Sequence, residues 1–426
     1  MKEDTKSGIA VVLILLFLIG VPADLRAQDF WSKFHPYISV QEEYNSNINL
    51  TPTNKKDDWI TTVTPGVRFN HNDAFTGLNM DVGGGYNWYA TNSDLDYWSV
   101  LGNFDGRYSP SRYWNFRLRD TIVRSDEPRE RDYLGSYDQY YVSTERQRSI
   151  YIRNIVEPSV EYRFGRENAL ALAYRNTYYD NENPGIEDSM ENYVSPRLTY
   201  WFDVRNGIIL EYGHTDAQFD TTSDWTGHNA RGRYTHRFTP HTSVFGEYLY
   251  QVRDFDQPSS VDYQTHAPSV GIEHAFSRAL TGLLQVGYYL QDPKSGDSQD
   301  GATVNANLTY RLEQRTTLSI YAIGGYREEY FTSENLGFVK YYRGGATVSH
   351  QLLRRLTLRL GGDVERAEYS ADREDWLYGV NAGLDYQILR WLTIGVTGSY
   401  RECNSDVDIN DYDEYRAIFR ITATYM

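Results

Sequence analysis

The sequence predicts an all-β fold: one transmembrane antiparallel β-barrel of about 20 strands, with 18 strands as the alternative count. Three observations lead to this fold class. Apolar and polar residues alternate over strand-length segments, a hairpin-sized unit recurs along the chain, and a low mean hydropathy accompanies 38 tyrosines in 426 residues. A barrel explains this composition, because every second strand residue faces a wet interior and tyrosines gather at the two membrane interfaces.

The alternation is clearest between Tyr378 and Arg401. Every second residue of YGVNAGLDYQI (378–388) is apolar, and LTIGVTGSY (392–400) repeats the pattern with one glycine in the apolar register. A period of two is that of a β-strand. Aromatic residues stand at the ends of these apolar faces and aliphatic residues in the middle, which is typical of the lipid-facing band of an outer-membrane barrel.

An apolar anchor residue precedes each predicted tight turn and marks the repeat. Successive anchors are 36 to 40 residues apart, except for one interval of 56, and Tyr425 lies 37 residues after the last. The anchors are Phe69, Tyr108, Phe164, Phe202, Phe238, Phe276, Leu312, Leu352 and Ile388. Such a repeat fits two strands, one tight turn and one longer loop. The predicted strands are 36–46, 59–70, 76–90, 97–108, 113–123, 149–164, 170–179, 192–202, 208–219, 225–238, 244–252, 263–276, 280–290, 302–312, 318–330, 339–352, 356–369, 376–388, 392–401 and 412–426.

Link length alternates along the chain. The turns after the anchors are tight, whereas links such as 50–57, 180–189 and 292–300 are longer and polar. Because outer-membrane barrels have short periplasmic turns and long outer loops, both termini are predicted on the periplasmic side. The interval of 56 contains a charged, tyrosine-rich insertion at 124–148. Two interpretations stay open for it: a solvated surface loop, or a loop folded into the pore mouth that constricts it or holds a ligand.

Residues 1–27 are predicted to be a cleaved signal peptide and residues 28–426 the barrel domain. Lys2 and Lys6 flank the start, an apolar run covers 9–21, and cleavage is expected after Ala27. An exported chain of this pattern belongs in the outer membrane of a Gram-negative-type bacterium, in contact with outer-membrane lipid. The net charge of −16 argues against a nucleic-acid partner, and the single cysteine, Cys403, allows no intramolecular disulfide.

The histidines and glycines predict no enzyme, and no catalytic, cofactor-binding or metal residues. His236, His274 and His350 stand two residues before an anchor, where tyrosines stand in other repeats, so they are expected in the interfacial girdle. The triplet 83–85 (GGG) lies inside a predicted strand without a following helix, so it is not a phosphate loop. A barrel hydrolase with a serine–histidine pair at one strand end stays open as an alternative.

Strand register predicts a charged inner face opposite the apolar band. Exposing an ionised side chain to hydrocarbon costs a large free energy, so the sequence predicts at least a water-filled lumen. Two interpretations stay open: a salt-bridged lining that stiffens a wide barrel, or an eyelet whose arginines and aromatics guide a polar or anionic polymer. The predicted lumen-lining residues are Arg117, Arg119, Arg153, Glu157, Glu161, Arg163, Arg197, Trp201, Arg231, Arg233, Arg311, Arg359, Asp363 and Asp385.

Four predicted strands carry a proline in the lipid-facing register. Proline has no N–H to donate to the ladder, so bulges or local bends in the wall are expected at these positions. The four residues are Pro65, Pro158, Pro196 and Pro268.

The opening of the mature chain resembles a known family. The segments PYISVQEEYNSNINL (36–50) and DDWITTVTPGVRF (57–69), with the repeated V-x-P-x-[VL]-x-[FY] pattern, are similar to β-barrel porins associated with exopolysaccharide loci. The matching residues are Glu42, Glu43, Tyr44, Asn45, Asn47, Ile48, Asp58, Pro65 and Gly66. The resemblance implies a non-enzymatic barrel that helps an extracellular polysaccharide cross or assemble at the outer membrane. It carries over no catalytic residues.

The expected partners follow from this picture. The last strand has an apolar face ending in Tyr425, close to the terminal signal that barrel-assembly machinery recognises. A polysaccharide and periplasmic or inner-membrane export proteins are the partners of the export function. The alternatives are a general diffusion porin for small polar solutes, a structural or adhesive barrel, and a barrel enzyme.

Overall fold

The computed structural model describes residues 32–126, 148–258, 260–313, 315–330, 336–369 and 373–425. The predicted signal peptide and most of the insertion 124–148 lie outside these residues. The strands are β1 Phe34–Asn45, β2 Asp58–Asn72, β3 Thr76–Tyr89, β4 Tyr97–Tyr108, β5 Trp114–Ser125, β6 Tyr151–Arg163, β7 Ala169–Asn181, β8 Ser189–Trp201, β9 Asn206–Phe219, β10 Trp225–Thr239, β11 Thr242–Phe255, β12 Tyr263–Ala275, β13 Leu280–Pro293, β14 Gln299–Leu312, β15 Thr316–Glu329, β16 Gly337–Leu353, β17 Leu356–Tyr369, β18 Arg373–Leu389, β19 Leu392–Ser405 and β20 Tyr412–Thr424. Two short 3₁₀ turns, η1 Ser93–Leu95 and η2 Asp408–Asn410, lie in links.

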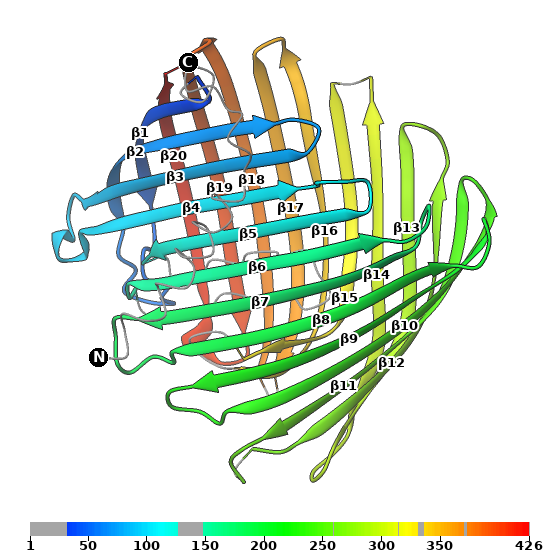
Figure 1. Cartoon of the computed structure of the whole chain (residues 1–426). Coiled ribbons are helices and arrows are strands. Elements are labelled where there is room, and N and C mark those ends of the chain that lie inside the picture. Colours follow the sequence, from blue (N-terminus) through cyan, green and yellow to red (C-terminus); the bar gives the residue numbers. More distant parts are fainter. Residues whose placement is uncertain are drawn as a thin grey trace, which may run out of the picture.

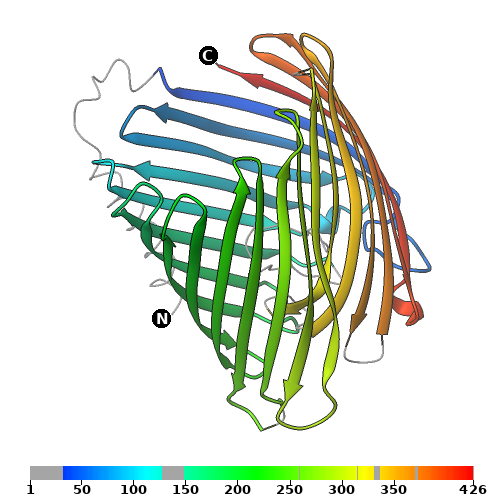
Figure 2. The same cartoon turned by 90° about the vertical axis from the view of Figure 1, so that its right-hand side faces the viewer.

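The strands form one closed antiparallel sheet of 20 strands. Each strand pairs with its neighbours in the sequence, and β20 pairs with β1 from Tyr37–Thr424 to Asn45–Arg416. Figures 1 and 2 show the resulting wall of long, tilted strands, which closes on itself where β1 and β20 meet. Closure leaves no unpaired edge, which a lipid-embedded sheet requires. The predicted fold class and the count of 20 strands are confirmed.

The links alternate in length, with one exception. The links after β16 and β18 contain only residues 354–355 and 390–391, whereas the link after β1 covers 46–57. The exception is the link between β17 and β18, which is confined to 370–372 although a longer loop was predicted at that end. The backbone N–H of Tyr425 donates to the carbonyl of Pro36 at 2.8 Å, so both ends of the barrel wall lie at the tight-turn end.

The outer face of the wall is apolar. Large side chains stand exposed in the register opposite the charged residues, among them Ile38, Leu172, Leu210 and Leu384. Exposure of this many large apolar groups marks a surface that contacts lipid. No helix among the described residues is long and apolar enough to cross a membrane.

The three girdle histidines share one arrangement on this outer face. Nδ1 of each ring lies 2.7 to 2.9 Å from a side-chain oxygen at the first residue of a neighbouring strand. These oxygens belong to Asn206 for His236, Thr242 for His274 and Thr316 for His350. The rings of His236 and His274 also pack edge-on against the following phenylalanine. Such rings present an apolar body with one satisfied polar atom, as the interface requires.

The four prolines interrupt the sheet without shifting its register. Pairing of β2 with β3 stops at Val63–Tyr86 and resumes at Gly66–Gly83, so the pairs next to Pro65 are missing. The same gap occurs between β6 and β7, β8 and β9, and β12 and β13. In each case the register before and after the gap is identical. The predicted loss of ladder bonds is correct. The unchanged register excludes bulges at these prolines, and the local bends expected as the alternative stay a prediction.

Surface labelling can test the orientation of the barrel. A short epitope inserted at Gly185 or Ser295, in the links 182–188 and 294–298, is expected to be recognised by antibody on intact cells. The same epitope at Arg355, in the tight link 354–355, should be recognised only after the outer membrane is permeabilised, because tight turns face the periplasm. The opposite labelling pattern would show that the barrel has the reverse orientation in the membrane.

Candidate functional site on the inner face of the barrel

The residues predicted to line the lumen all lie in one register. Strand pairing places Arg119 opposite Glu157, Arg197 opposite Glu211, and Arg359 opposite Gly383, on the face that carries no lipid-facing side chains. Side chains of this face reach past a neighbouring strand: Arg233 of β10 bonds Glu273 of β12 at 2.6 Å. Such contacts fit the concave side of a closed wall. That these residues line a passage for solute stays a prediction.

Most arginines of the inner face are paired with carboxylates. Arg117 binds Asp105 through two nitrogens at 2.6 and 2.9 Å, and Arg231 lies 2.6 Å from Glu211 and 3.5 Å from Glu247. Further pairs are Arg119–Glu157, Arg163–Glu161, Arg343–Asp363 and Arg359–Asp385. The charges are therefore distributed around the wall as pairs rather than gathered in one positive patch.

The remaining predicted residues differ in their surroundings. Arg153 is buried, and the guanidinium of Arg237 lies over the Trp201 ring at 3.5 Å. Within the described part of the chain, the side chains of Arg197 and Arg311 take part in no ion pair. Both are exposed, so they are the uncompensated positive charges of the predicted set.

The inward turn of β15 is a feature that the sequence interpretation missed. A continuous strand was predicted over 318–330, but pairing between β14 and β15 ends at Val304–Gly324. The next residue, Gly325, has φ +136°, a backbone conformation that glycine adopts readily and other residues rarely adopt. Across the resulting gap, the Tyr342 hydroxyl of β16 donates to the carbonyl of Ala302 at 2.9 Å. The signal in the sequence was the pair Gly324–Gly325.

The part of the chain beyond Gly325 packs against the inner wall. We call residues 325–330 and 336–339 the inward hairpin. Arg253 of β11 forms an ion pair with Glu328 at 2.6 Å, and the Tyr263 hydroxyl of β12 donates to Glu328 at 2.7 Å and lies 2.9 Å from the Tyr330 hydroxyl. Tyr326 donates to Gln251 of β11. Since β11 and β15 are separated by three strands, these contacts cross the interior.

Aromatic rings complete this contact. Phe338 of the inward hairpin stacks on Tyr326 with ring centroids 5.1 Å apart and lies 5.9 Å from both Tyr263 and Tyr289. Tyr330 packs on Trp225 of β10 at 5.5 Å. One face of the inward hairpin is thus bound to strands β10 to β13 by rings as well as by charges.

The opposite face of the inward hairpin holds a buried charge cluster. Arg327 bonds Glu329 at 2.5 Å and Glu365 of β17 at 2.7 Å, and all three side chains are at most 6% exposed. Next to it, Val339, Tyr341, Ala367 and Tyr369 form a buried apolar cluster. The hairpin is therefore fixed on both sides.

A second inward element comes from the link 46–57. Ile48 packs with Ile60 and Tyr89 on one side of the barrel closure, and Leu50 packs with residues of β18 to β20 on the other. Arg148, at the end of the insertion, donates to the carbonyl of Ile48 at 2.6 Å and pairs with Asp126 at 2.9 Å. The two ends of the insertion, at Asp126 and Arg148, are thus held together inside the barrel. Residues 127–147, on which its two interpretations depend, lie outside the described residues.

Burial shapes the electrostatics under the inward hairpin. Burial, and after it the charge of Glu328, raises the pKa of the Tyr330 hydroxyl above its usual value. The shift favours the neutral hydroxyl, which lies within hydrogen-bond distance of the Tyr263 hydroxyl.

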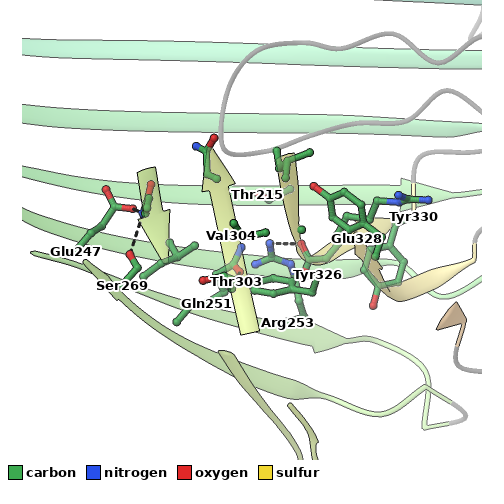
Figure 3. Close-up of a pocket in the computed structure, with 18 of the residues that line it drawn as sticks. Thr215, Glu247, Gln251, Arg253, Ser269, Thr303, Val304, Tyr326, Glu328 and Tyr330 are labelled. Carbon is green, nitrogen blue, oxygen red and sulfur yellow. Dashed lines mark hydrogen bonds and ion pairs between the residues drawn. The ribbon is translucent and has the colours of Figure 1, made fainter. Parts of the chain in front are cut away.

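A cavity of about 180 Å³ lies between the inward hairpin and the wall. Figure 3 shows Arg253 and Glu328 close together at one end of its lining, with Tyr326 and Tyr330 near this pair and Glu247 and Ser269 at the other end. Gln285 donates to Glu247 at 3.0 Å and to Ser269 at 2.8 Å at that end. The cavity combines aromatic rings with amide, hydroxyl and paired ionic groups.

An apolar outer belt, a closed 20-stranded wall and a charged inner face define the class: an outer-membrane β-barrel of the porin type. Residues 33–140 and 220–425 match the family described as "Putative beta-barrel porin 2". These segments make up more than half of the chain, so the chain belongs to that family. It resides in the outer membrane of a Gram-negative bacterium. A search of curated proteins finds no match.

Solved barrels share the architecture at low sequence identity. The siderophore receptor PirA of Pseudomonas aeruginosa is 8% identical, with a TM-score of 0.52 over 92% of this chain and 80% of that one. A mutant of the ferric enterobactin receptor PfeA from the same species gives 0.51, also with 8% identity, 92% and 80%. Pseudomonas aeruginosa OpdK with vanillate is 12% identical, with a TM-score of 0.46 over 92% and 99%. The two receptors support the barrel fold alone.

Proposed function

We propose that this barrel is a channel through which small polar solutes cross the outer membrane without chemical change. The observation that carries the proposal is the inner face, where charged and amide side chains run around the wall and most charges are paired. A lining of this kind hydrates a passage, and its paired charges leave only a modest field on a passing ion. The inward hairpin and the link 46–57 occupy part of the interior, which favours small solutes over a long polymer.

Export of an extracellular polysaccharide is the second candidate function. It is favoured by the aromatic rings and amides that the interior presents together, such as Trp225 and Tyr326 beside Gln251 and Gln285. Sugars combine an apolar ring face with a rim of hydroxyl groups, so such surfaces suit them. A polymer passage would require the inward hairpin to move away from the wall.

Reconstitution distinguishes these two functions. The purified barrel is expected to conduct potassium chloride in planar bilayers and to let a pentose such as arabinose enter proteoliposomes, which then swell, while dextran stays excluded. Absence of both current and swelling would contradict the channel. If deletion of the gene abolishes surface polysaccharide and leaves small-solute uptake unchanged, polysaccharide export is the function of the barrel and solute diffusion is not.

A further inference from the structure

The charged side chains that line the cavity under the inward hairpin all take part in ion pairs. Its charged lining residues are Glu247, Arg253, Arg327 and Glu328, and each has an oppositely charged partner. The distances are 3.5 Å for Glu247 to Arg231, 2.6 Å for Arg253 to Glu328 and 2.7 Å for Arg327 to Glu365. A charged ligand would have to break one of these pairs or remain unpaired in a poorly hydrated site, which is costly. The cavity therefore favours a neutral ligand.

Hydrogen-bonding groups are nevertheless left over. Thr215, Thr303 and Asn305 line the cavity from β9 and β14, and among the described residues their side chains have no hydrogen-bond partner. They offer two hydroxyls and one amide, each able both to donate and to accept. A purely apolar ligand would leave these groups unsatisfied, so the cavity favours a ligand rich in groups that donate and accept hydrogen bonds.

Aromatic rings supply the apolar part of the lining. Tyr326, Tyr330 and Trp225 border the cavity, and one face of Tyr326 is covered by Phe338 at 5.1 Å with an angle of 11° between the ring planes. The Tyr289 ring also contacts Tyr326, with a centroid distance of 4.9 Å, so the Tyr326 ring is held in a fixed orientation where it borders the cavity. The electron-rich face of a fixed aromatic ring attracts weakly positive C–H groups.

Size restricts the ligand further. The volume of about 180 Å³ is below the roughly 300–1,000 Å³ of pockets that hold drug-sized molecules. One six-membered ring with its substituents matches this volume better than a chain of several rings. Neutrality, many hydroxyl groups, an apolar ring face and this size together describe one sugar ring.

We propose that the cavity between the inward hairpin and strands β9 to β14 is a binding subsite for one neutral sugar ring. The inference rests on the proposed function, because the ligand must first enter the lumen. Asn305, Thr215 and Thr303 bind the hydroxyl groups of the ring, and Tyr326 packs on its C–H face. Occupancy narrows the remaining passage, so it lowers the ion current.

Current block measures this binding. In planar bilayers glucose is expected to reduce the ion current saturably, whereas sorbitol, which is an open chain, and glucuronate, which is charged, should reduce it much less. Asn305→Ala and Tyr326→Ala should each raise the half-blocking glucose concentration about tenfold, equivalent to about 1.4 kcal/mol. Tyr326→Phe keeps the aromatic ring, so this variant should change the half-blocking glucose concentration by less than about threefold.

Asn307→Ala is the matched control. Asn307 lies two residues from Asn305 on the inner face of β14 but does not line the cavity, so glucose block should stay unchanged. The inference is overturned if glucose reduces the current no more than sorbitol does. It is also overturned if the half-blocking glucose concentration of Asn305→Ala and Tyr326→Ala equals that of the wild type. If the barrel carries no current, the proposed function fails, and equilibrium dialysis of labelled glucose against the detergent-solubilised barrel still decides the subsite.

Discussion

Replacing Arg327 by leucine is expected to lower the free energy of unfolding by roughly 3–5 kcal/mol, the cost of breaking a buried ion pair from one side. Arg327 is 1% exposed and bonds Glu329 and Glu365, which are 6% and 0% exposed. Without the guanidinium, the buried carboxylates of Glu329 and Glu365 would both lose this positively charged partner. Urea-induced unfolding of the refolded barrel in lipid vesicles, followed by tryptophan fluorescence, measures the change.

Two further variants make this prediction specific. Arg359→Leu removes a pair whose arginine is 61% exposed, so it should cost about 1 kcal/mol or less. Adding Glu329→Gln and Glu365→Gln to Arg327→Leu should recover part of the loss, because the two side chains that lost the guanidinium are then neutral. If Arg327→Leu and Arg359→Leu unfold at the same urea concentration, the inward hairpin is not fixed by this cluster.

The second large effect is expected on ion selectivity. The triple variant Arg117→Gln, Arg119→Gln and Arg197→Gln should assemble normally and shift the barrel toward cations. Asp105 and Glu157 lose their partners, and Arg197 is one of the few uncompensated positive charges. A unit charge at about 4 Å contributes about 1 kcal/mol in water, so the permeability ratio should change roughly threefold to tenfold. The reversal potential across a salt gradient measures it.

Stability and charge controls accompany this variant. The side chains of Arg117 and Arg119 are 42% and 52% exposed, so each loss should cost less than about 1 kcal/mol. Arg278→Gln, Arg354→Gln and Arg390→Gln remove the same charge from exposed tight links and should leave the reversal potential unchanged. If the reversal potential of the triple variant at Arg117, Arg119 and Arg197 is unchanged, these arginines do not set ion selectivity and only stiffen the wall. If polysaccharide is the cargo, surface polymer should also fall.

The register of the wall could be predicted from the sequence because it depends on local alternation. A strand shifted by one residue would place every lipid-facing side chain in water, so the apolar pattern selects one face for residues such as Leu172 and Leu384. The anchor spacing likewise predicts the strand count, since two strands and two links consume a fixed length of chain. The prolines show the limit of this reasoning: a missing N–H predicts a lost ladder bond, but whether the wall bulges depends on neighbouring strands.

The inward hairpin and the charge pairs could not be predicted in this way. Alternation assigns Tyr326 and Glu328 to the lipid face, and only the turn at Gly325 brings them to the inside. Their partners Gln251, Arg253 and Tyr263 are more than 60 residues away and three or four strands around the wall.

The sequence by itself determined that this chain is an outer-membrane barrel of about 20 strands with a charged inner face, because lipid imposes a two-residue period that can be read locally. Only the tertiary structure decided that most inner arginines are neutralised, that β15 turns inward and that a cavity forms beneath it. These features depend on the curvature of the closed wall, which brings together side chains from strands that are not neighbours.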